Sequence, residues 1–105
     1  MYAKALSELK TLILEVQISE SSQVEHDAQN KCFSAVIDGY QALLEYRVLD
    51  EHSIDIYHTF VPDELRGQGV AAVLAKEALA YAKQQELTVV PSCSYIAVYL
   101  ERHPQ

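Results

Sequence analysis

Two glycines, Gly67 and Gly69, stand directly before the clearest helical pattern of the sequence. Neither residue has a side chain that can cap a helix, so the first N–H groups of that helix lack a local partner. Such N–H groups, at the positive end of the helix dipole, form a site for an anion, and phosphate is a frequent occupant. The sequence therefore predicts that the main chain of residues 66–71 holds a phosphate-bearing ligand.

The same two glycines allow other interpretations. Gly67-x-Gly69-x-x-Ala72 fits a loose dinucleotide-binding fingerprint, with Glu86 about twenty residues further on. The dinucleotide-binding fold needs more parallel β-α-β units than 105 residues supply, which argues against it. A P-loop is excluded because no Lys-Ser or Lys-Thr follows the glycines. The structural alternative is that the glycines only permit a tight turn between a strand and a helix.

The segments around this turn predict an α+β domain. Period-two alternation and a hairpin turn at Asp38-Gly39 indicate an antiparallel meander, whose last strand ends at Pro62 because proline cannot join a ladder. A helix after Gly69 and a short apolar run before Pro91 add a strand, a crossover helix and a parallel strand. The expected strands cover residues 33–37, 40–49, 54–61 and 87–90.

Three helices are expected. The central helix places its apolar residues on one face, which is typical of a helix that covers a sheet; these residues are Val70, Ala71, Leu74, Ala78, Tyr81 and Ala82. A short helix is expected over residues 94–102, before Pro104. Residues 2–17 have an amphipathic helical pattern, although part of this segment would also pass as a short strand. We interpret residues 1–105 as a single domain with residues 1–22 as an N-terminal extension.

Composition limits the possible functions. The net charge of −7 argues against a nucleic-acid binder, because binding phosphate backbones needs clustered lysine and arginine. The N-terminus has no secretion signal and no stretch is long enough to span a membrane. Cys32 and Cys93 fit no zinc spacing, and no metal site is predicted. We expect reduced thiols in a cytoplasmic protein, with Cys32 in the core.

The motif Arg66-Gly67-Gln68-Gly69-Val70-Ala71 matches the acetyl-CoA signature of the GNAT N-acetyltransferase superfamily. The elements His58-Thr59-Phe60-Val61-Pro62 and Pro91-x-Cys93-x-Tyr95 occur around it in order. Residues 23–104 thus resemble a family of small single-domain GNAT-like proteins. The resemblance implies a truncated GNAT-like fold: a three- to four-stranded antiparallel meander, a parallel β-α-β pair and a short C-terminal helix. The chain departs from the superfamily pattern because it lacks the first strand–helix units, which usually form the acceptor pocket.

The resemblance also implies how acetyl-CoA would bind. The main chain of residues 66–71 would hold the pyrophosphate, in agreement with the argument from the glycines. The pantetheine arm would enter the gap between the strands 54–61 and 87–90 and bond main-chain groups of Phe60 and Val61. Arg66 would either contact phosphate or remain a solvated turn residue. The implied binding residues are Phe60, Val61, Arg66, Gly67, Gln68, Gly69, Val70, Ala71, Ser94 and Tyr95.

Acyl transfer from a thioester to an amine needs a base, stabilisation of the oxyanion and a proton for the leaving thiolate. His58 is a candidate base; on simple alternation it shares a face with Ile54, Ile56 and Phe60, where it would otherwise only pack on the sheet. Cys93 precedes a helix and is a candidate nucleophile or proton donor, or else a small buried residue. Tyr99, with Tyr95 as the second choice, is a candidate proton donor to the thiolate, or packs against the core.

Two hypotheses follow. The protein is an N-acetyltransferase that passes acetyl from acetyl-CoA to an amine, either a small molecule or a protein lysine. Alternatively, it is a module that binds CoA or acetyl-CoA without catalysis, as a sensor or a partner subunit. A dinucleotide enzyme remains as a third interpretation.

Overall fold

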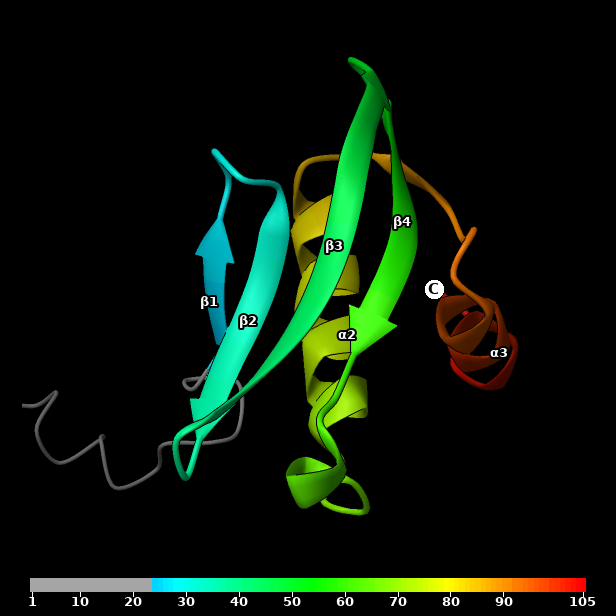
Figure 1. The fold of residues 1–105 in the computed structure, drawn as a ribbon. Helices are drawn as coiled ribbons and strands as arrows, with labels where there is room; N and C mark the ends of the chain where they lie inside the picture. The colour runs from blue at the N-terminus through cyan, green and yellow to red at the C-terminus, as the bar shows by residue number, and fades with distance from the viewer. Residues whose placement is uncertain (1–23) are drawn as a thin grey trace, which may run out of the picture.

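The computed structural model describes residues 24–105, which form a five-stranded sheet with a long helix across one face (Figure 1). In chain order the strands are β1 (Val24–Asp27), β2 (Cys32–Ile37), β3 (Tyr40–Asp50), β4 (Ser53–Phe60) and β5 (Thr88–Val90). The helices are η3 (Asp63–Leu65), α2 (Val70–Gln84) and α3 (Ser94–Arg102). The helix expected within residues 1–22 lies outside the described residues.

The first four strands form the antiparallel meander that the sequence predicts. The strands follow one another across the sheet in chain order. The β2–β3 turn has Asp38 at φ 53° and Gly39 at φ 83°, both in the left-handed region. This is the geometry that two-residue hairpins prefer, because its twist matches that of the strands. The predicted hairpin is confirmed, and β1 supplies a fourth antiparallel strand.

The predicted crossover is also confirmed. β5 lies parallel to β4, with Ile54 opposite Val89 and Asp55 opposite Val90. Between them α2 crosses one face of the sheet and buries its apolar side against it (Figure 1). The largest fully buried side chains of this core are Leu44, Ile54, Ile56, Leu65, Leu74 and Ile96. No helix in the described part of the chain is long and apolar enough to cross a membrane.

A β-bulge interrupts β4 at Tyr57. Glu45 of β3 pairs with His58, but the next residue, Tyr46, pairs with Ile56, so Tyr57 is an extra residue in the ladder. A bulge re-aims the side chains that follow it, because the period-two alternation restarts one residue later. Before the bulge the even-numbered residues of β4 face α2, and after the bulge the odd-numbered residue Thr59 does.

The bulge corrects one expectation from the sequence. Ile54 and Ile56 lie buried under α2, as predicted. His58 and Phe60 do not share that face, because each lies opposite a β3 residue of the other face and both are exposed. The prediction assumed alternation without a bulge and therefore put His58 and Phe60 on the wrong face of the sheet. Thr59 faces the helix layer instead.

The face of the sheet opposite α2, here called the open face, has no described helix packed on it (Figure 1). Its residues follow from the strand register, because directly opposed residues project to the same side. Two rows cross four strands: the first is Glu25, Ser34, Leu43 and Phe60, and the second is Asp27, Cys32, Glu45 and His58. Cys32 therefore lies half-buried on the open face and not in the α2 core, which corrects another expectation.

Candidate functional site

The turn before α2 has the conformation that its glycines suggest. Gly67 has φ 82° and Gly69 has φ 77°, a region that residues with a side chain rarely adopt. A Cβ at either position would meet no atom within 4 Å, so the space in front of the turn is open. The glycines are needed for the backbone path, and they also leave the turn accessible to a ligand.

The start of α2 is uncapped. Gly69 is the N-cap and supplies no side-chain hydrogen bond. The N–H of Val73 donates to the carbonyl of Gly69 at 3.1 Å, which is the first bond of the helix. The four N–H groups that precede this bond have no intrahelical acceptor, as at any helix start. No side chain caps these groups, so an anion site at this turn stays a prediction that the uncapped helix start supports.

Two polar side chains of the motif bond back to their own turn. Nε of Arg66 lies 3.4 Å from the carbonyl oxygen of Val61 and 3.2 Å from Oδ1 of Asp63. Nε2 of Gln68 donates to the carbonyl of Glu64 at 3.2 Å. These bonds hold the turn in shape, and they make the main chain, more than Arg66, the group available to an anion.

β4 and β5 stop pairing before β4 ends, and the place where the two strands separate is here called the gap. The parallel pairing ends with Asp55 opposite Val90, because Pro91 cannot continue the ladder. One further bond, from the N–H of Cys93 to the carbonyl of Ile56 at 2.9 Å, anchors the chain before α3 begins. Beyond Ile56 the edge of β4 has no β5 partner, which leaves main-chain groups of its last residues free for another extended group.

Cys93 lies at this point of separation. It is the N-cap residue of α3, and its side chain does not cap the helix. Its Sγ lies 3.4 Å from Oγ1 of Thr59, which the β4 bulge turns toward the helix layer. The thiol is half-buried and free. A thiol at a helix start with a hydroxyl beside it is arranged for proton transfer or nucleophilic chemistry.

The two candidate tyrosines follow Cys93 along α3. The rings of Tyr95 and Tyr99 have centroids 6.2 Å apart, and Tyr99 stacks on His103 at 4.3 Å. Burial raises the pKa of Tyr95, with further contributions from Tyr99 and Cys93. Tyr95 lies in the first turn of α3, two residues after Cys93, while Tyr99 lies one turn further along the helix.

His58 is separated from this group by the sheet itself. It projects from the open face beside Glu45, whereas Thr59 and Cys93 lie on the other side. The structure thus brings Cys93 and Thr59 together and places His58 across β4 from them. A base at His58 would act on a group that arrives over the open face.

The remaining predicted binding residues surround the gap. Phe60 is exposed on the open face, and Val61 packs half-buried against the core at the end of β4. Ser94 is the exposed first residue of α3. Val70 is buried and Ala71 is half-buried, so in the first turn of α2 only their main chain can serve a ligand.

Sequence reasoning missed two residues of the site. Thr59 carries the hydroxyl beside Cys93. Its position within the His58–Pro62 element was the feature of the sequence that could have pointed to it. Asp55 is the buried polar residue of the described chain: its Oδ1 accepts the N–H of Ser92 at 3.3 Å and its Oδ2 lies 3.3 Å from Nε of Arg47. It holds the segment that leads into Cys93, and nothing in its sequence position announces that contact.

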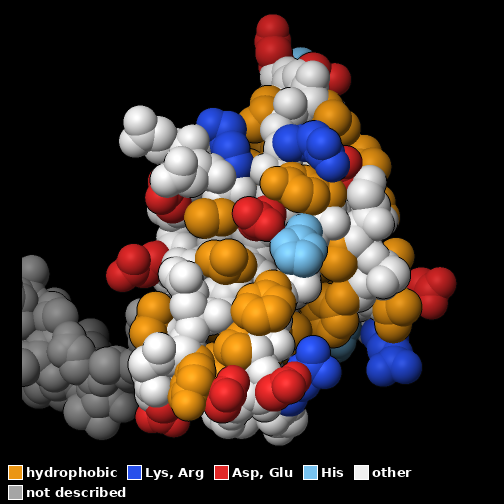
Figure 2. All heavy atoms as spheres, in the orientation of Figure 1, with side chains coloured by type: hydrophobic (Ala, Val, Ile, Leu, Met, Phe, Trp, Pro, Cys, Tyr) orange, Lys and Arg blue, Asp and Glu red, His pale blue; other side chains and the backbone are white. Residues whose placement is uncertain are grey.

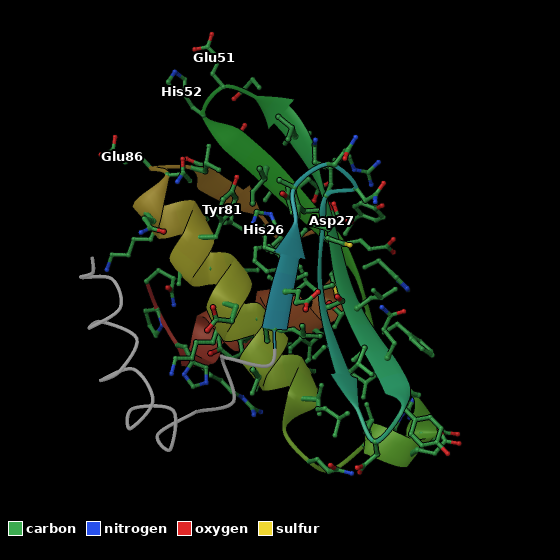
Figure 3. The ribbon with its side chains drawn as sticks, turned by 90° about the vertical axis from the view of Figure 1, so that its left-hand side faces the viewer. His26, Asp27, Glu51, His52, Tyr81 and Glu86 are labelled. Carbon is green, nitrogen blue, oxygen red and sulfur yellow. The ribbon has the colours of Figure 1, made fainter. Side chains whose placement is uncertain are left out.

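A separate aromatic cluster lies between β1 and α2. The His26 ring stacks on the Phe33 ring, with the two centroids 4.1 Å apart. It makes an edge contact with Tyr81, with centroids 4.4 Å apart (Figure 3). Its Nε2 lies 2.6 Å from the Tyr46 hydroxyl oxygen. Burial lowers the pKa of His26, although the Asp27 carboxylate acts in the opposite direction. Burial, with Tyr81 beside it, raises the pKa of Tyr46 to about 12. This cluster holds the edge strand β1 against the helix.

Comparison with known proteins identifies relatives that share most of this domain. The family model described as GCN5-related N-acetyl-transferase matches residues 32–105. The chain is 36% identical over 88 residues to Protein NATD1 of Xenopus tropicalis, covering 82% of this chain and 81% of that protein. It is 38% identical over 84 residues to Protein NATD1 of Mus musculus, covering 78% of this chain and 76% of that protein. The Protein NATD1 of Homo sapiens is 36% identical over 84 residues, with 78% and 74% covered.

Proposed function

This chain belongs to the GCN5-related N-acetyl-transferase family, and we propose that it transfers the acetyl group of acetyl-CoA to an amine. The observation that carries the proposal is the uncapped start of α2 at Gly69, in a turn with open space before it. The short helix η3 connects that turn to the end of β4, the strand that separates from β5 (Figure 1). CoA is a long molecule, so it needs a site for its diphosphate and, next to it, a place between the parallel strands for its pantetheine arm.

Within residues 66–71 the diphosphate of CoA would bind the N–H groups that follow Arg66, since the N–H of Arg66 itself donates to the carbonyl of Asp63 at 3.1 Å. Several N–H groups converge there at the positive end of the α2 dipole, which favours a doubly charged group. Arg66 supports the site indirectly, since its Nε is bonded to Val61 and paired with Asp63. The protein thus supplies a rigid main-chain cradle at the cost of two glycines in left-handed conformations.

The pantetheine arm would lie in the gap between β4 and β5. Its two amide groups resemble a peptide, so they can bond the unpaired edge of β4 as an added strand does. The edge in question begins after Ile56, whose carbonyl is already bonded to Cys93, and ends at Phe60; Val61 follows directly, and its N–H would be the group that it offers, since its carbonyl lies 3.4 Å from Nε of Arg66. This arrangement directs the thioester toward the end of the gap where Cys93 and Thr59 meet.

In the reaction, the amine nitrogen bonds to the acetyl carbon, the carbon–sulfur bond breaks, and CoA leaves as its thiol. We assign His58 to accept the proton of an amine that arrives over the open face. Cys93 is placed to donate a proton to the leaving sulfur, because it lies on the gap side beside Thr59. Tyr99 is the alternative donor, and its stacking on His103 fixes the direction of its ring.

The proposal is tested by mixing the protein with acetyl-CoA and following free thiol with a chromogenic disulfide. A panel of amines, including a lysine peptide, serves as acceptor, and the acetylated product is identified by mass spectrometry. Amine-dependent thiol release that Cys93→Ala or His58→Gln lowers supports an acetyltransferase. Tight CoA binding with no release for any amine favours the alternative, a CoA-binding module without catalysis.

A further inference from the structure

The open face of the sheet carries an acidic strip that no described helix covers. Its two cross-strand rows contain three carboxylates, and Asp55 adds a fourth next to them. The permanent cation that projects from the described strands onto this face is Arg47, which is already paired with Asp55. Among residues 24–105 three carboxylates of this face therefore have no cationic partner: Glu25, Asp27 and Glu45.

The strip is also hollowed and partly apolar. A hollow of about 520 Å³ lies over β1, β2 and β3, and Glu25, Asp27, Ser34 and Leu43 are among the residues that line it. That volume is within the range of sites that take a side chain or a small ligand. Figure 2 shows hydrophobic side chains gathered over the same face, with acidic side chains among them.

The apolar part extends toward β5. Phe60 is 47% exposed and Tyr57 is 38% exposed, and the Arg47 guanidinium lies 4.2 Å over the Tyr57 ring. Large exposed apolar groups next to unpaired carboxylates suit a partner that carries both lysines and apolar residues. A small polyamine would use only the charges, and leave the apolar part of the face uncovered.

The dimensions favour an extended polypeptide. The rows run from β1 to β4, three strand spacings of about 4.8 Å, or roughly 14 Å in all. An extended chain rises about 3.3 Å per residue, so two lysines about four residues apart reach both ends of a row. The hollow, lined by Glu25 and Asp27, lies at the β1 end of both rows, and His58, the base assigned above, lies at the β4 end of the second row.

We propose that the open face binds a lysine-bearing, extended segment of a protein, with one lysine in the hollow near Glu25 and the acceptor lysine at His58. This inference rests on the proposed acetyl transfer, and it makes the acceptor a protein lysine and not a small amine. Charge complementarity selects the segment, and the apolar residues along Leu43 and Phe60 contact its intervening side chains.

The test is fluorescence anisotropy with a dye-labelled peptide of about eight residues that alternates apolar residues with two lysines four residues apart. The double variant Glu25→Gln with Glu45→Gln removes two charges without disturbing the turn that Asp27 holds through Asn30. The control is Glu51→Gln, at the far tip of the β3–β4 hairpin (Figure 3). Binding of CoA by each variant is measured in parallel by calorimetry.

We expect the wild type and Glu51→Gln to bind the peptide alike, and the double variant to bind about five- to thirtyfold more weakly. Binding should also weaken with added salt. The inference is overturned if the double variant binds as tightly as wild type, if a glutamate version of the peptide binds equally, or if spermidine competes as well as the peptide. Loss of CoA binding with intact peptide binding would instead remove the proposed function and leave the surface assignment standing.

Discussion

The hydroxyl of Thr59 lies 3.4 Å from the sulfur of Cys93, although 34 residues separate them in the chain. The contact spans the point where β4 and β5 separate, and it depends on the bulge at Tyr57, which turns Thr59 toward the helix layer. One residue of irregularity in a strand thus brings a hydroxyl to the thiol and sends His58 to the opposite face.

We predict that Cys93→Ala lowers amine-dependent thiol release from acetyl-CoA by about tenfold or more, because the leaving sulfur loses its proton donor. The affinity for CoA, measured by calorimetry, should stay within about twofold, since the phosphate cradle is elsewhere. Val98→Ala, which shortens an exposed side chain of the same helix α3, is the control and should leave turnover unchanged. Equal effects of the two variants would contradict the role of Cys93.

Thr59→Val should lower the same rate about three- to tenfold, the usual consequence of losing one hydrogen bond of a near-isosteric side chain. In the Cys93→Ala background the substitution should have no further effect, because the two residues act through one contact. Thr88→Val, at the exposed start of β5, controls for loss of a hydroxyl. Additive effects in this double-mutant cycle would show that the two groups work independently.

Asp55→Ala is expected to lower the free energy of unfolding by about 1 to 3 kcal/mol, measured by urea denaturation. The Asp55 side chain is 11% exposed, so its removal leaves the N–H of Ser92 and the Arg47 guanidinium without their acceptor. Asp55→Asn retains an acceptor oxygen and should cost less. Glu51→Ala, an exposed turn residue, should change stability by under about 0.5 kcal/mol. A loss no greater for Asp55→Ala than for Glu51→Ala would contradict this account.

The stability of the domain should depend on pH through His26. Its folded-state pKa lies below the ordinary value of 6.5, mainly because of burial, so the folded state resists protonation more than the unfolded chain does. The contribution of His26 to the free energy of unfolding is constant well above pH 6.5. It is lost as the pH falls from 6.5 through the lowered pKa of the folded state.

His26→Phe keeps a ring against Phe33 and Tyr81 but cannot gain a proton. Urea unfolding from about pH 7.5 to about pH 5 should therefore show a smaller loss of stability in the variant than in the wild type. If the difference in unfolding free energy between the two proteins is the same at every pH, His26 does not titrate as the structure implies.

Local chemistry in the sequence was enough to predict the main elements of the fold. The Asp38-Gly39 turn, the stop at Pro62, the glycines before α2 and the stop at Pro91 all lie where the sequence puts them, because each is decided by backbone preferences of one or two residues. The antiparallel order and the parallel crossover follow from short turns and from a helix between two strands.

The parts that the sequence did not predict depend on contacts between distant residues. A bulge at Tyr57 is a mismatch of register with β3, and β4 alone carries no sign of it. β1 is only four residues long, and it is held by the contacts of His26 with Phe33 and Tyr81. The pairing of Thr59 with Cys93 needs the whole crossover to be in place, so it could not be read from either segment.

The central claim is that the main chain at the start of α2 holds the diphosphate of CoA. It is tested most directly by titration calorimetry of CoA against the wild type, Gly69→Asp and Gly39→Asp. Gly39 is also left-handed and has equally open surroundings, so its variant reports the backbone cost of the same substitution away from the site. We predict that CoA binds the wild type and Gly39→Asp alike and that Gly69→Asp, with a negative charge in the cradle, binds at least about tenfold more weakly. Absence of CoA binding by the wild type, or equal binding by folded Gly69→Asp, would contradict the account.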